Sequence, residues 1–403
     1  MKELIQDLNI DKTTWKLTKF GDVAIQQKKT LDRENTSITR YVKGEHMASE
    51  DIHLRQWGEL KDEYLGPAFI RYFEEGDILY GSRRTYLKKV TVAPFSGITS
   101  NTTFVIKANE EILDKRLLPF LMLSDGFTEH SVRNSKGSVN PYINWKDVAN
   151  YEFLLPPLAE QARLAELLWA MDKVIQESKS LEVSLLNTKK SEFKEYIFES
   201  SDTNDQRFGQ LKSKHPVRKL DKLITQLQYG ISESLLDKGE IPVLRMNNLQ
   251  DGKLDLTDLK FYNQRKGEID QFILNQGDIL FNRTNSFELV GKVSLFQEPF
   301  KCSFASYLIR IKTDPNKLDP RYLNTFLNSS IGLAKIRKYR TPGVSQSNIN
   351  AQSLRKLDLP LPALAEQIIL MNKLDQLNEL IECCQSKKSS SKALLQSMIH
   401  EVF

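Results

Sequence analysis

Two long stretches of the chain, 159–198 and 365–401, carry apolar residues at three- and four-residue intervals, which predicts two amphipathic helices. The first stretch contains neither proline nor glycine. At ~1.5 Å per residue, each helix would be roughly 55–60 Å long, too long to be buried in one small domain. The stripes consist of Leu164, Leu168, Met171, Ile175 and Leu185, and of Leu370, Leu374, Leu377, Ile381, Cys384, Leu395 and Met398, the second being interrupted by Lys388 and Ser391. A narrow apolar stripe on each helix predicts that the two pack together as an antiparallel coiled coil.

The chain repeats itself. Gly76-Asp77-Ile78-Leu79 returns as Gly277-Asp278-Ile279-Leu280, and the segment 155–161 returns as 361–367 with the shared pattern Leu-Pro-x-Leu-Ala-Glu-Gln. Each copy of that second pattern begins a long helix: proline stands just ahead of it and a glutamate lies in its first turn, both typical start signals. The duplication predicts a pseudo-twofold molecule made of two similar globular units, each followed by its own helix.

Each globular unit has the pattern of a mixed α/β fold. Both open with a short strand and a turn, at 15–24 and 216–224. Apolar and β-branched runs predict strands at 241–245, 291–296 and 308–311, and one-sided apolar patterns predict a helix over 115–130 and another over 320–339. The polar stretch 199–206 reads as an unstructured linker. We therefore predict an α+β fold with globular domains at 1–157 and 215–361, spacer helices at 158–198 and 362–403, and a linker at 199–214.

Composition narrows the class of protein. The 403 residues, 40% of them hydrophobic, suffice for two cores, and the net charge of +5 favours an anionic ligand only weakly. The three cysteines, Cys302, Cys383 and Cys384, lack metal-ligand spacing and indicate a reducing compartment. The first residues contain no signal-like apolar run, and no apolar run approaches the ~20 residues of a membrane span, so we expect a cytoplasmic protein without membrane contact.

Catalytic signatures are absent from the sequence. It contains no glycine-rich dinucleotide or phosphate loop, no zinc-protease motif and no nucleophile elbow, and its five histidines are dispersed. Asn140-Pro141-Tyr142 is similar to the Asn-Pro-Pro-Tyr loop of adenine methyltransferases, but it is one proline short and no cofactor loop precedes it. A turn before Ile143 is the better interpretation.

The segments that follow each Gly-Asp-Ile-Leu strand, 80–89 and 281–292, differ from each other and are rich in polar residues. Arginine can bind guanine and asparagine can bind adenine with paired hydrogen bonds, while Ser, Thr and Lys can hold phosphates. Ordinary solvated loops remain the alternative. The candidate contact residues are Arg83, Arg84, Thr85, Tyr86, Lys88 and Lys89 in the first unit, and Asn282, Arg283, Thr284, Asn285 and Ser286 in the second.

Several further residues are weaker candidates for DNA contact: Arg245, Asn247, Asn248, Ser345, Gln346 and Asn348. Arg245 has an alternative role, since it can pair with a carboxylate near its strand. Asp77 and Asp278 are expected to shape the turn before a strand, not to bind a ligand. The lysines on the first long helix, Lys173, Lys179, Lys189, Lys190 and Lys194, are expected to form a solvated face more than a phosphate-binding one.

Together, the duplicated units, the Pro-x-Leu-Ala-Glu-Gln mark before each long helix, Gly277–Asn285 and Val344–Asn350 resemble the specificity subunit of type I restriction-modification systems over essentially the whole chain. The first unit departs from this pattern: Ser82-Arg83-Arg84-Thr85 stands where the second has Asn282-Arg283-Thr284-Asn285.

The resemblance implies a DNA-binding subunit with two target-recognition domains and two conserved helices that separate the domains and set the distance between two DNA half-sites. It also implies partners: two methyltransferase (modification) subunits, which methylate adenine with S-adenosylmethionine, and restriction subunits, which translocate DNA with ATP and Mg²⁺. No cofactor or metal is expected on this chain. A prokaryotic cytoplasm and a role in phage defence follow from the same resemblance.

The main hypothesis is thus sequence-specific recognition of an asymmetric, bipartite double-stranded DNA target without catalysis. Three alternatives stay open. They are a coiled-coil scaffold that binds proteins, a specificity subunit of a methyltransferase-only or type IIB-like system, and a self-sufficient nuclease or methyltransferase.

Overall fold

The computed structural model describes residues 10–33, 35–205, 208–250, 252–263, 269–342 and 347–403. The chain forms two compact units, and each long helix is divided between them. Unit 1 comprises the residues up to Leu181 together with Cys384–Phe403, and unit 2 comprises Glu182–Cys383. Among the described residues, no helix combines the length and the apolar character needed to cross a membrane.

Unit 1 combines short strands with short helices around one main core. Its elements in chain order are η1 (Lys12–Thr14), β1 (Lys16–Lys19), α2 (Phe20–Val23), β2 (Ala24–Gln27), β3 (Arg40–Val42), β4 (Gly58–Glu59), β5 (Phe69–Phe73), β6 (Ile78–Gly81), η2 (Thr85–Leu87), β7 (Val90–Val92), β8 (Gly97–Ser100), β9 (Thr103–Ala108), α3 (Leu118–Leu123), α4 (Asp125–Arg133), α5 (Trp145–Ala149), β10 (Glu152–Leu155) and the first part of α6 (Leu158–Ile197). The expected mixture of strands and helices is confirmed.

Unit 2 repeats this order with additional short strands. After α6 come β11 (Phe198–Asp205), β12 (Gly209–Ser213), β13 (Val217–Lys219), η3 (Leu220–Lys222), β14 (Ile224–Tyr229), β15 (Ile241–Leu244), η4 (Met246–Asn248), β16 (Leu249–Gln250), β17 (Lys253–Leu254), β18 (Lys260–Tyr262), η5 (Asp270–Phe272), β19 (Ile279–Asn282), β20 (Thr284–Asn285), β21 (Val293–Leu295), β22 (Ser303–Phe304), β23 (Leu308–Thr313), α7 (Pro320–Asn328), α8 (Ser330–Arg337), β24 (Thr341–Pro342), β25 (Ser347–Asn348), α9 (Ala351–Arg355), β26 (Asp358–Pro360) and α10 (Leu364–Val402).

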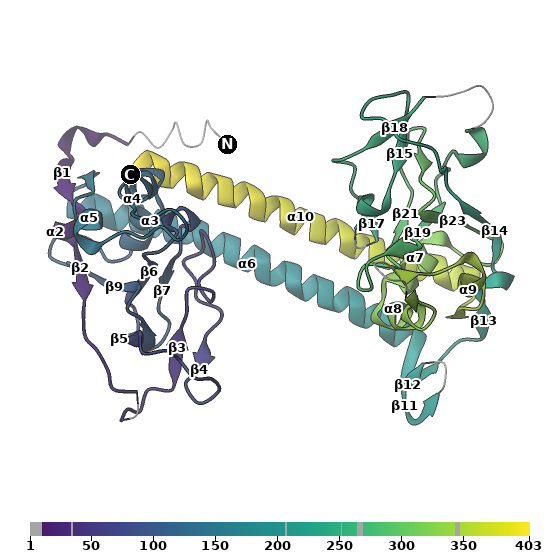
Figure 1. The fold of residues 1–403 in the computed structure, drawn as a ribbon, viewed down its shortest axis with the longest axis horizontal. Helices are drawn as coiled ribbons and strands as arrows, with labels where there is room; N and C mark the ends of the chain where they lie inside the picture. Colours follow the sequence, from purple (N-terminus) through teal and green to yellow (C-terminus); the bar gives the residue numbers. More distant parts are fainter. Residues whose placement is uncertain (1–9, 34, 206–207, 251, 264–268, 343–346) are drawn as a thin grey trace. The chain divides into compact units, whose positions relative to one another are not determined.

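The predicted repeat extends to sheet topology. A four-stranded antiparallel sheet has the order β2-β9-β6-β7 in unit 1 and β14-β23-β19-β21 in unit 2, and Figure 1 shows these strands side by side within each unit. In each unit a second sheet contains one parallel pair, β3 with β8 and β15 with β22. The opening strand pairs with the strand that precedes the long helix, β1 with β10 and β13 with β26. In each repeat, the strand that opens the globular part therefore pairs with the strand that closes it; in unit 2 the β11–β12 hairpin precedes this opening strand.

The single helix predicted over 115–130, and the one over 320–339, are each two helices. The break falls at Ser124 in unit 1 and at Ser329 in unit 2, where the backbone is extended. Each serine side chain accepts a hydrogen bond from the main chain of the following helix, at Phe127 N (3.2 Å) and Gly332 N (3.1 Å). A serine that caps a new helix start competes with continuation of the preceding helix, which the apolar periodicity does not reveal.

The interval 199–214, predicted to be an unstructured linker, instead begins with a β-hairpin. β11 and β12 pair antiparallel, with Phe198 opposite Ser213. Phe198 and Phe208 are buried in the core of unit 2 and their rings are 5.1 Å apart. Burial of this aromatic pair outweighs the polar composition of the segment, which was the basis of the prediction.

The two long helices begin and end within a residue or two of the predicted positions and pack antiparallel. In unit 2, Lys189 Nζ donates to Asn378 Oδ1 (2.6 Å), and Lys373 Nζ lies 2.9 Å from a carboxylate oxygen of Glu192. Advancing along α6 therefore corresponds to moving back along α10. The predicted stripe is used for packing: Leu164 and Leu168 join Leu395 and Met398 in the core of unit 1, and Leu370 and Leu374 join the core of unit 2.

A buried glutamine fastens each globular unit to the start of its helix. Gln161 Nε2 donates to Ile112 O (3.0 Å) and Pro156 O (2.9 Å), and its Oε1 accepts from Asp114 N (2.8 Å). Gln367 makes the same three bonds, to Lys317 O, Pro362 O and Asp319 N, at 2.9–3.0 Å. These side chains are the last residues of the repeated Leu-Pro-x-Leu-Ala-Glu-Gln pattern. The pattern therefore marks a three-bond clamp as well as a helix start.

Candidate nucleic-acid interface

The loops singled out by the sequence lie at the ends of two equivalent strands, β6 and β19. The turn before each strand has a glycine in the left-handed region, Gly76 (φ +87°) and Gly277 (φ +93°). Asp77 Oδ2 accepts from Glu74 N (2.8 Å), and Asp278 Oδ2 accepts from Asn275 N (3.0 Å). Both carboxylates are buried, and burial raises the pKa of each. The prediction that these aspartates shape the turn is confirmed.

In unit 1 the loop forms a tight 3-10 turn, η2. Arg84 (φ +49°) and Lys88 (φ +47°) stand on either side of it in the left-handed region, where residues other than glycine cost energy. The candidate side chains divide into two groups. Arg83, Arg84 and Tyr86 are exposed, whereas Thr85 is buried with its hydroxyl 3.2 Å from Ser135 Oγ. Sequence reasoning did not separate these groups, because it could not see which side of the turn faces inward.

The two lysines of this loop are engaged in other contacts. Lys88 Nζ lies 2.6 Å from Asp125 Oδ1, and Lys89 Nζ donates to the carbonyl of Gly44. Burial lowers the pKa of Lys89. Of the six candidates in unit 1, the exposed arginines and Tyr86 are therefore best placed to reach a ligand.

A second loop of unit 1, which the sequence analysis did not select, lies against the first. Arg84 N donates to Pro141 O (2.7 Å), Arg83 and Tyr142 form a β-bridge, and Ile143 N donates to Ser82 O (2.9 Å). Val139 is 94% exposed and Tyr142 is 43% exposed. The Asn-Pro-Tyr segment is thus a turn beside the candidate loop, as its preferred interpretation had it. The sequence did contain a signal for this loop, because its repeat counterpart in unit 2, 345–348, includes candidate contact residues.

In unit 2 the structure brings together two candidate groups that are far apart in the sequence. β20 pairs antiparallel with β25, so that Thr284 lies opposite Asn348. Thr284 Oγ1 donates to Asn348 Oδ1 (2.5 Å), and Ile349 N donates to Arg283 O (2.9 Å). Ser345 and Gln346 lie outside the described residues. The same pair of loops therefore meets in both units, with different side chains.

Arg283 is held by an aromatic ring. Its guanidinium carbon lies 4.8 Å from the centre of the Tyr229 ring, and its Nη1 donates to Ser306 O (3.4 Å). Asn282, by contrast, is fully buried and its Oδ1 accepts from Thr284 N (3.3 Å). Asn282 thus lies inside the base of the loop. The prediction that its side chain contacts DNA is not supported by this buried position. Asn285 and Ser286 are half-buried, and Asn285 Oδ1 accepts from Ser286 N (2.8 Å).

Arg245 and Asn247 belong to a different part of unit 2. Both donate to the same carboxylate oxygen, Asp258 Oδ2, at 2.8 Å and 3.0 Å. Asn248 is buried and bonds to the carbonyls of Asp255 and Asp258. The alternative role of Arg245, pairing with a carboxylate, is confirmed. A carboxylate at this position repels phosphate, so this group fits a DNA backbone poorly.

A basic segment at the end of α8 was missed by the sequence analysis. Arg337 and Lys338 are exposed, and Arg340 packs its guanidinium 4.1 Å from the centre of the Phe287 ring in the candidate loop. Arg340 Nη1 also donates to the carbonyl of Phe287. The run Lys-Ile-Arg-Lys-Tyr-Arg at 335–340 was a visible charge cluster, but it was read only as part of a helix.

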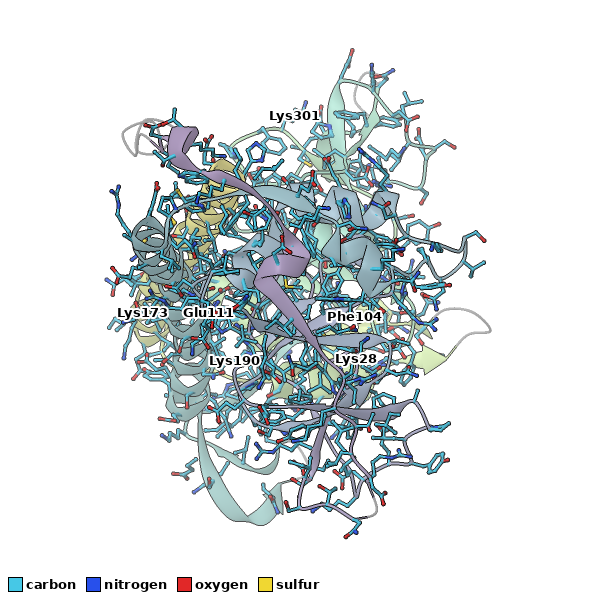
Figure 2. All side chains as sticks on the ribbon, turned by 90° about the vertical axis from the view of Figure 1, so that its left-hand side faces the viewer. Lys28, Phe104, Glu111, Lys173, Lys190 and Lys301 are labelled. Carbon is cyan, nitrogen blue, oxygen red and sulfur yellow. The ribbon has the colours of Figure 1, made fainter. Side chains whose placement is uncertain are left out.

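The lysines of the long helix α6 differ in their surroundings. Figure 2 labels Lys173 and Lys190, both exposed. Lys189 is half-buried at the helix pair, and burial lowers its pKa. Lys179 lies 4.0 Å from Asp51. These surroundings fit the expected solvated face, except that Lys189 packs between the helices.

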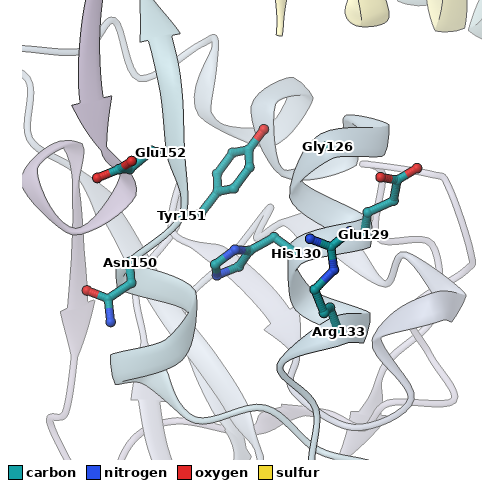
Figure 3. A pocket seen from close by; sticks show the side chains of 7 residues that line it. All are labelled: Gly126, Glu129, His130, Arg133, Asn150, Tyr151 and Glu152. Carbon is teal, nitrogen blue, oxygen red and sulfur yellow. The ribbon is translucent and has the colours of Figure 1, made fainter.

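A hollow in unit 1 lies outside these loops. In unit 1 a shallow pocket of about 310 Å³ is lined by residues of α4 and of the segment leading into β10 (Figure 3). His130 bonds to the carbonyl of Asp147 (2.7 Å), and none of the lining residues is Ser, Thr, Cys or Lys: they are Gly126, Glu129, His130, Arg133, Asn150, Tyr151 and Glu152. Within the described parts of the chain, no cluster of three or more His, Cys, Asp or Glu side chains forms a metal site. Cys302 is buried, which raises its pKa to about 12.

Comparison with known proteins gives the family. The model of the type I restriction modification DNA specificity domain matches residues 12–185 and 228–390, one match in each half of the repeat and together most of the chain. The chain belongs to this family. The matched ranges include both candidate loops and most of each long helix of this specificity-domain protein.

Curated relatives and solved structures agree with this assignment. The StySPI type I restriction enzyme specificity subunit of Salmonella potsdam is 30% identical over 184 residues, 45% of this chain and 39% of that protein. The MjaVIII specificity subunit of Methanocaldococcus jannaschii is 26% identical over 306 residues, 72% of this chain and 70% of that protein. With the first relatives, the chain therefore matches only about two fifths of their length. The type I S subunit of M. genitalium, 12% identical with a TM-score of 0.58 over 98% of this chain and 96% of that one, shows the same fold.

Proposed function

We propose that this specificity-domain protein is the DNA sequence-recognition subunit of a type I restriction-modification complex and binds an asymmetric, bipartite double-stranded DNA target. One observation carries the proposal: the same pair of loops meets at the same place in both units, but with unlike side chains. A repeated frame with unequal polar loops suits the reading of two different half-sites.

The chemistry of each loop supports base reading. Unit 2 offers Arg283, which packs on Tyr229, beside Asn285, and unit 1 offers Arg83 beside Tyr86 and Tyr142. An arginine packed on an aromatic ring can still present its planar fork to the paired acceptors of guanine. The nearby cations Arg337 and Lys338 supply positive charge for phosphates.

We further propose that the chain itself performs no catalysis. Methyltransferase subunits, two per complex, would use S-adenosylmethionine, and restriction subunits would use ATP and Mg²⁺, in a prokaryotic cytoplasm. Family membership supports this division of labour. It leaves open a related methyltransferase-only or type IIB-like system, and the experiments below apply to either. A self-sufficient nuclease or methyltransferase would require activity from this chain alone.

The test is methylation mapping with the chain and its modification partner, followed by a pair of reciprocal variants. Mapping should give one bipartite, asymmetric target, and a single continuous site would contradict the proposal. Arg283→Ala should weaken binding by about 1–3 kcal/mol through one half-site only, and Arg83→Ala should do so through the other. Arg218→Ala, which removes an exposed arginine on β13, is the matched control and should leave binding unchanged.

Half-site assignment comes from duplexes in which one half-site at a time is scrambled. The Arg283→Ala protein should bind the intact duplex and the duplex with a scrambled unit 2 half-site with similar affinity. Scrambling the other half-site should still weaken its binding. An equal loss on every duplex would make Arg283 a phosphate contact. The protein-scaffold alternative predicts no steep fall of DNA affinity with salt, whereas phosphate neutralisation predicts one.

A further inference from the structure

The candidate loop of unit 2 ends in an apolar tip that base-edge reading does not use. Phe287 is 59% exposed and Leu289 is 44% exposed, both between the polar residues 282–286 and the strand β21. Large exposed apolar side chains beside hydrogen-bonding groups indicate a surface that becomes covered on binding. Unit 1 has an exposed aromatic in the corresponding loop, Tyr86, at 55%.

The tip is firmly supported. Leu289 N and Val290 N both donate to Ser286 O, at 3.2 Å and 3.0 Å, and at the base of the loop Gly291 N donates to Asn282 O (2.8 Å). In unit 1, the two left-handed residues on either side of η2 give Tyr86 an equally defined position. Each aromatic is thus presented at a fixed place on a short loop, and neither belongs to a long flexible segment.

Phe287 is also held from behind by a cation. The Arg340 guanidinium lies 4.1 Å from the centre of the ring and donates to the Phe287 carbonyl, so it covers part of the ring and fixes the main chain. Arg337 and Lys338, exposed on the same segment, add positive charge. An exposed ring with one cation packed on it matches a polyanion that has flat apolar faces, as DNA has, better than an ordinary apolar protein surface.

We propose that Phe287 is a stacking residue that packs against a base face at a step of the half-site read by unit 2, with Arg340 as its positioning residue. Tyr86 holds the corresponding position in unit 1. The inference rests on the proposed function and deepens it: beside arginine contacts to base edges, each half-site includes one step that an aromatic side chain partly unstacks. Such a step is read through the ease with which it deforms.

The experiment uses the full chain with its modification partner and the mapped target, carrying 2-aminopurine in turn at each position of the unit 2 half-site. Binding of the parent protein should raise the fluorescence at one step besides the adenine that the modification partner extrudes for methylation, because unstacking relieves quenching. Phe287→Ala should abolish this rise and weaken target binding about tenfold, the usual scale for loss of one stacked base. Phe287→Tyr should keep both, and Arg340→Lys should reduce the fluorescence rise while retaining the charge.

The matched control is Phe300→Ala, which removes another exposed phenylalanine of unit 2 and should change neither readout. The inference is overturned if Phe287→Ala binds and unstacks the target like the parent while Arg283→Ala fails at the same half-site. It is equally overturned if Phe287→Ala loses the modification partner instead of the DNA signal, since the tip would then be a protein contact. Absence of any sequence-specific binding by the parent would instead defeat the proposed function.

Discussion

Units 1 and 2 share a frame but differ at matching positions inside it. In the central sheet Leu79 lies opposite Val105, and the equivalent pair in unit 2 is Leu280 and Arg310. Val105 belongs to an apolar core cluster, whereas Arg310 is 3% exposed and donates to main-chain carbonyls at 2.8 Å. Its guanidinium lies 3.5 Å from Asp278. The frame is thus held by backbone pairing and turns, which tolerate an arginine where the other copy has a valine.

The comparison extends to the loops on that frame. Gly81 and Asn282 occupy the same register position, and the segments that follow them form a 3-10 turn in one unit and a paired strand in the other. The sequence alignment of Ser82 with Asn282 is therefore wrong by one residue: Ser82 O accepts from Ile143 N as Arg283 O accepts from Ile349 N, so Ser82 is the counterpart of Arg283. The clamps formed by Gln161 and Gln367 are, in contrast, alike in all three bonds. The parts that join each unit to its helix are alike, and the parts proposed to read DNA are unlike.

The largest expected effect comes from removing the buried arginine. Arg310→Met leaves the Asp278 carboxylate buried beside unpaired carbonyls, so the free energy of unfolding should fall by about 3–5 kcal/mol. Urea denaturation of the full chain measures this, with the exposed Lys222→Met as control, expected within about 0.5 kcal/mol of the parent. Unchanged stability would mean that Arg310 is replaceable by an apolar residue and that the two interiors are equivalent.

The same variant has a pH signature. Burial raises the pKa of Asp278 and the charge of Arg310 opposes this rise, so Arg310→Met should raise the pKa of Asp278 further. A carboxyl whose folded pKa is raised costs stability above that pKa and none once it is protonated in both states. The difference in free energy of unfolding between the parent and Arg310→Met should therefore become smaller as the pH falls through the raised pKa of Asp278. Urea denaturation of both proteins at neutral and at mildly acid pH measures this difference.

The next effect tests the shared frame. Gln161→Leu and Gln367→Leu each leave three backbone groups without their partner, which should cost roughly 2–4 kcal/mol in either unit. Gln56→Leu changes an exposed glutamine and serves as control. A large loss of unfolding free energy for one variant and none for the other would show that the same three hydrogen bonds do not stabilise the two units equally.

The smallest effect concerns the helix breaks. Ser124→Ala and Ser329→Ala each remove a helix cap and should lower the free energy of unfolding by about 1 kcal/mol, whereas the glycine variants should cost only a few tenths. Thermal or urea denaturation of the four variants gives the comparison. An alanine variant as stable as its glycine counterpart would show that the break is set by packing alone.

The sequence predicted the features that depend on periodicity and repetition. The long helices, the repeat and the strands at 241–245 and 308–311 agree with the structure, because a continuous stripe or alternation survives folding. The breaks at Ser124 and Ser329 and the hairpin after Ile197 were missed, since a single cap and one buried aromatic pair leave no periodic signal. The meeting of Arg283 with Asn348 and Tyr229 depends on tertiary pairing and was likewise invisible.

The division of the candidate residues into buried and exposed side chains also depends on tertiary structure. An arginine, a threonine and an asparagine in one loop have similar chemistry on paper. Only the fold decides that Thr85 and Asn282 face inward while Arg84 and Tyr86 face outward. The DNA contacts themselves stay predictions, and the half-site experiments decide them.

The division of the long helices between the units affects the order in which the parts of the protein can fold during synthesis. Unit 1 needs Leu395, Met398 and Val402 for its core, although the rest of it precedes Leu181. On the ribosome, therefore, the unit translated first cannot complete its interior until residues 395–402 have emerged. A nascent chain stalled before Cys384 would leave the apolar side of early α6 bare and available to chaperones.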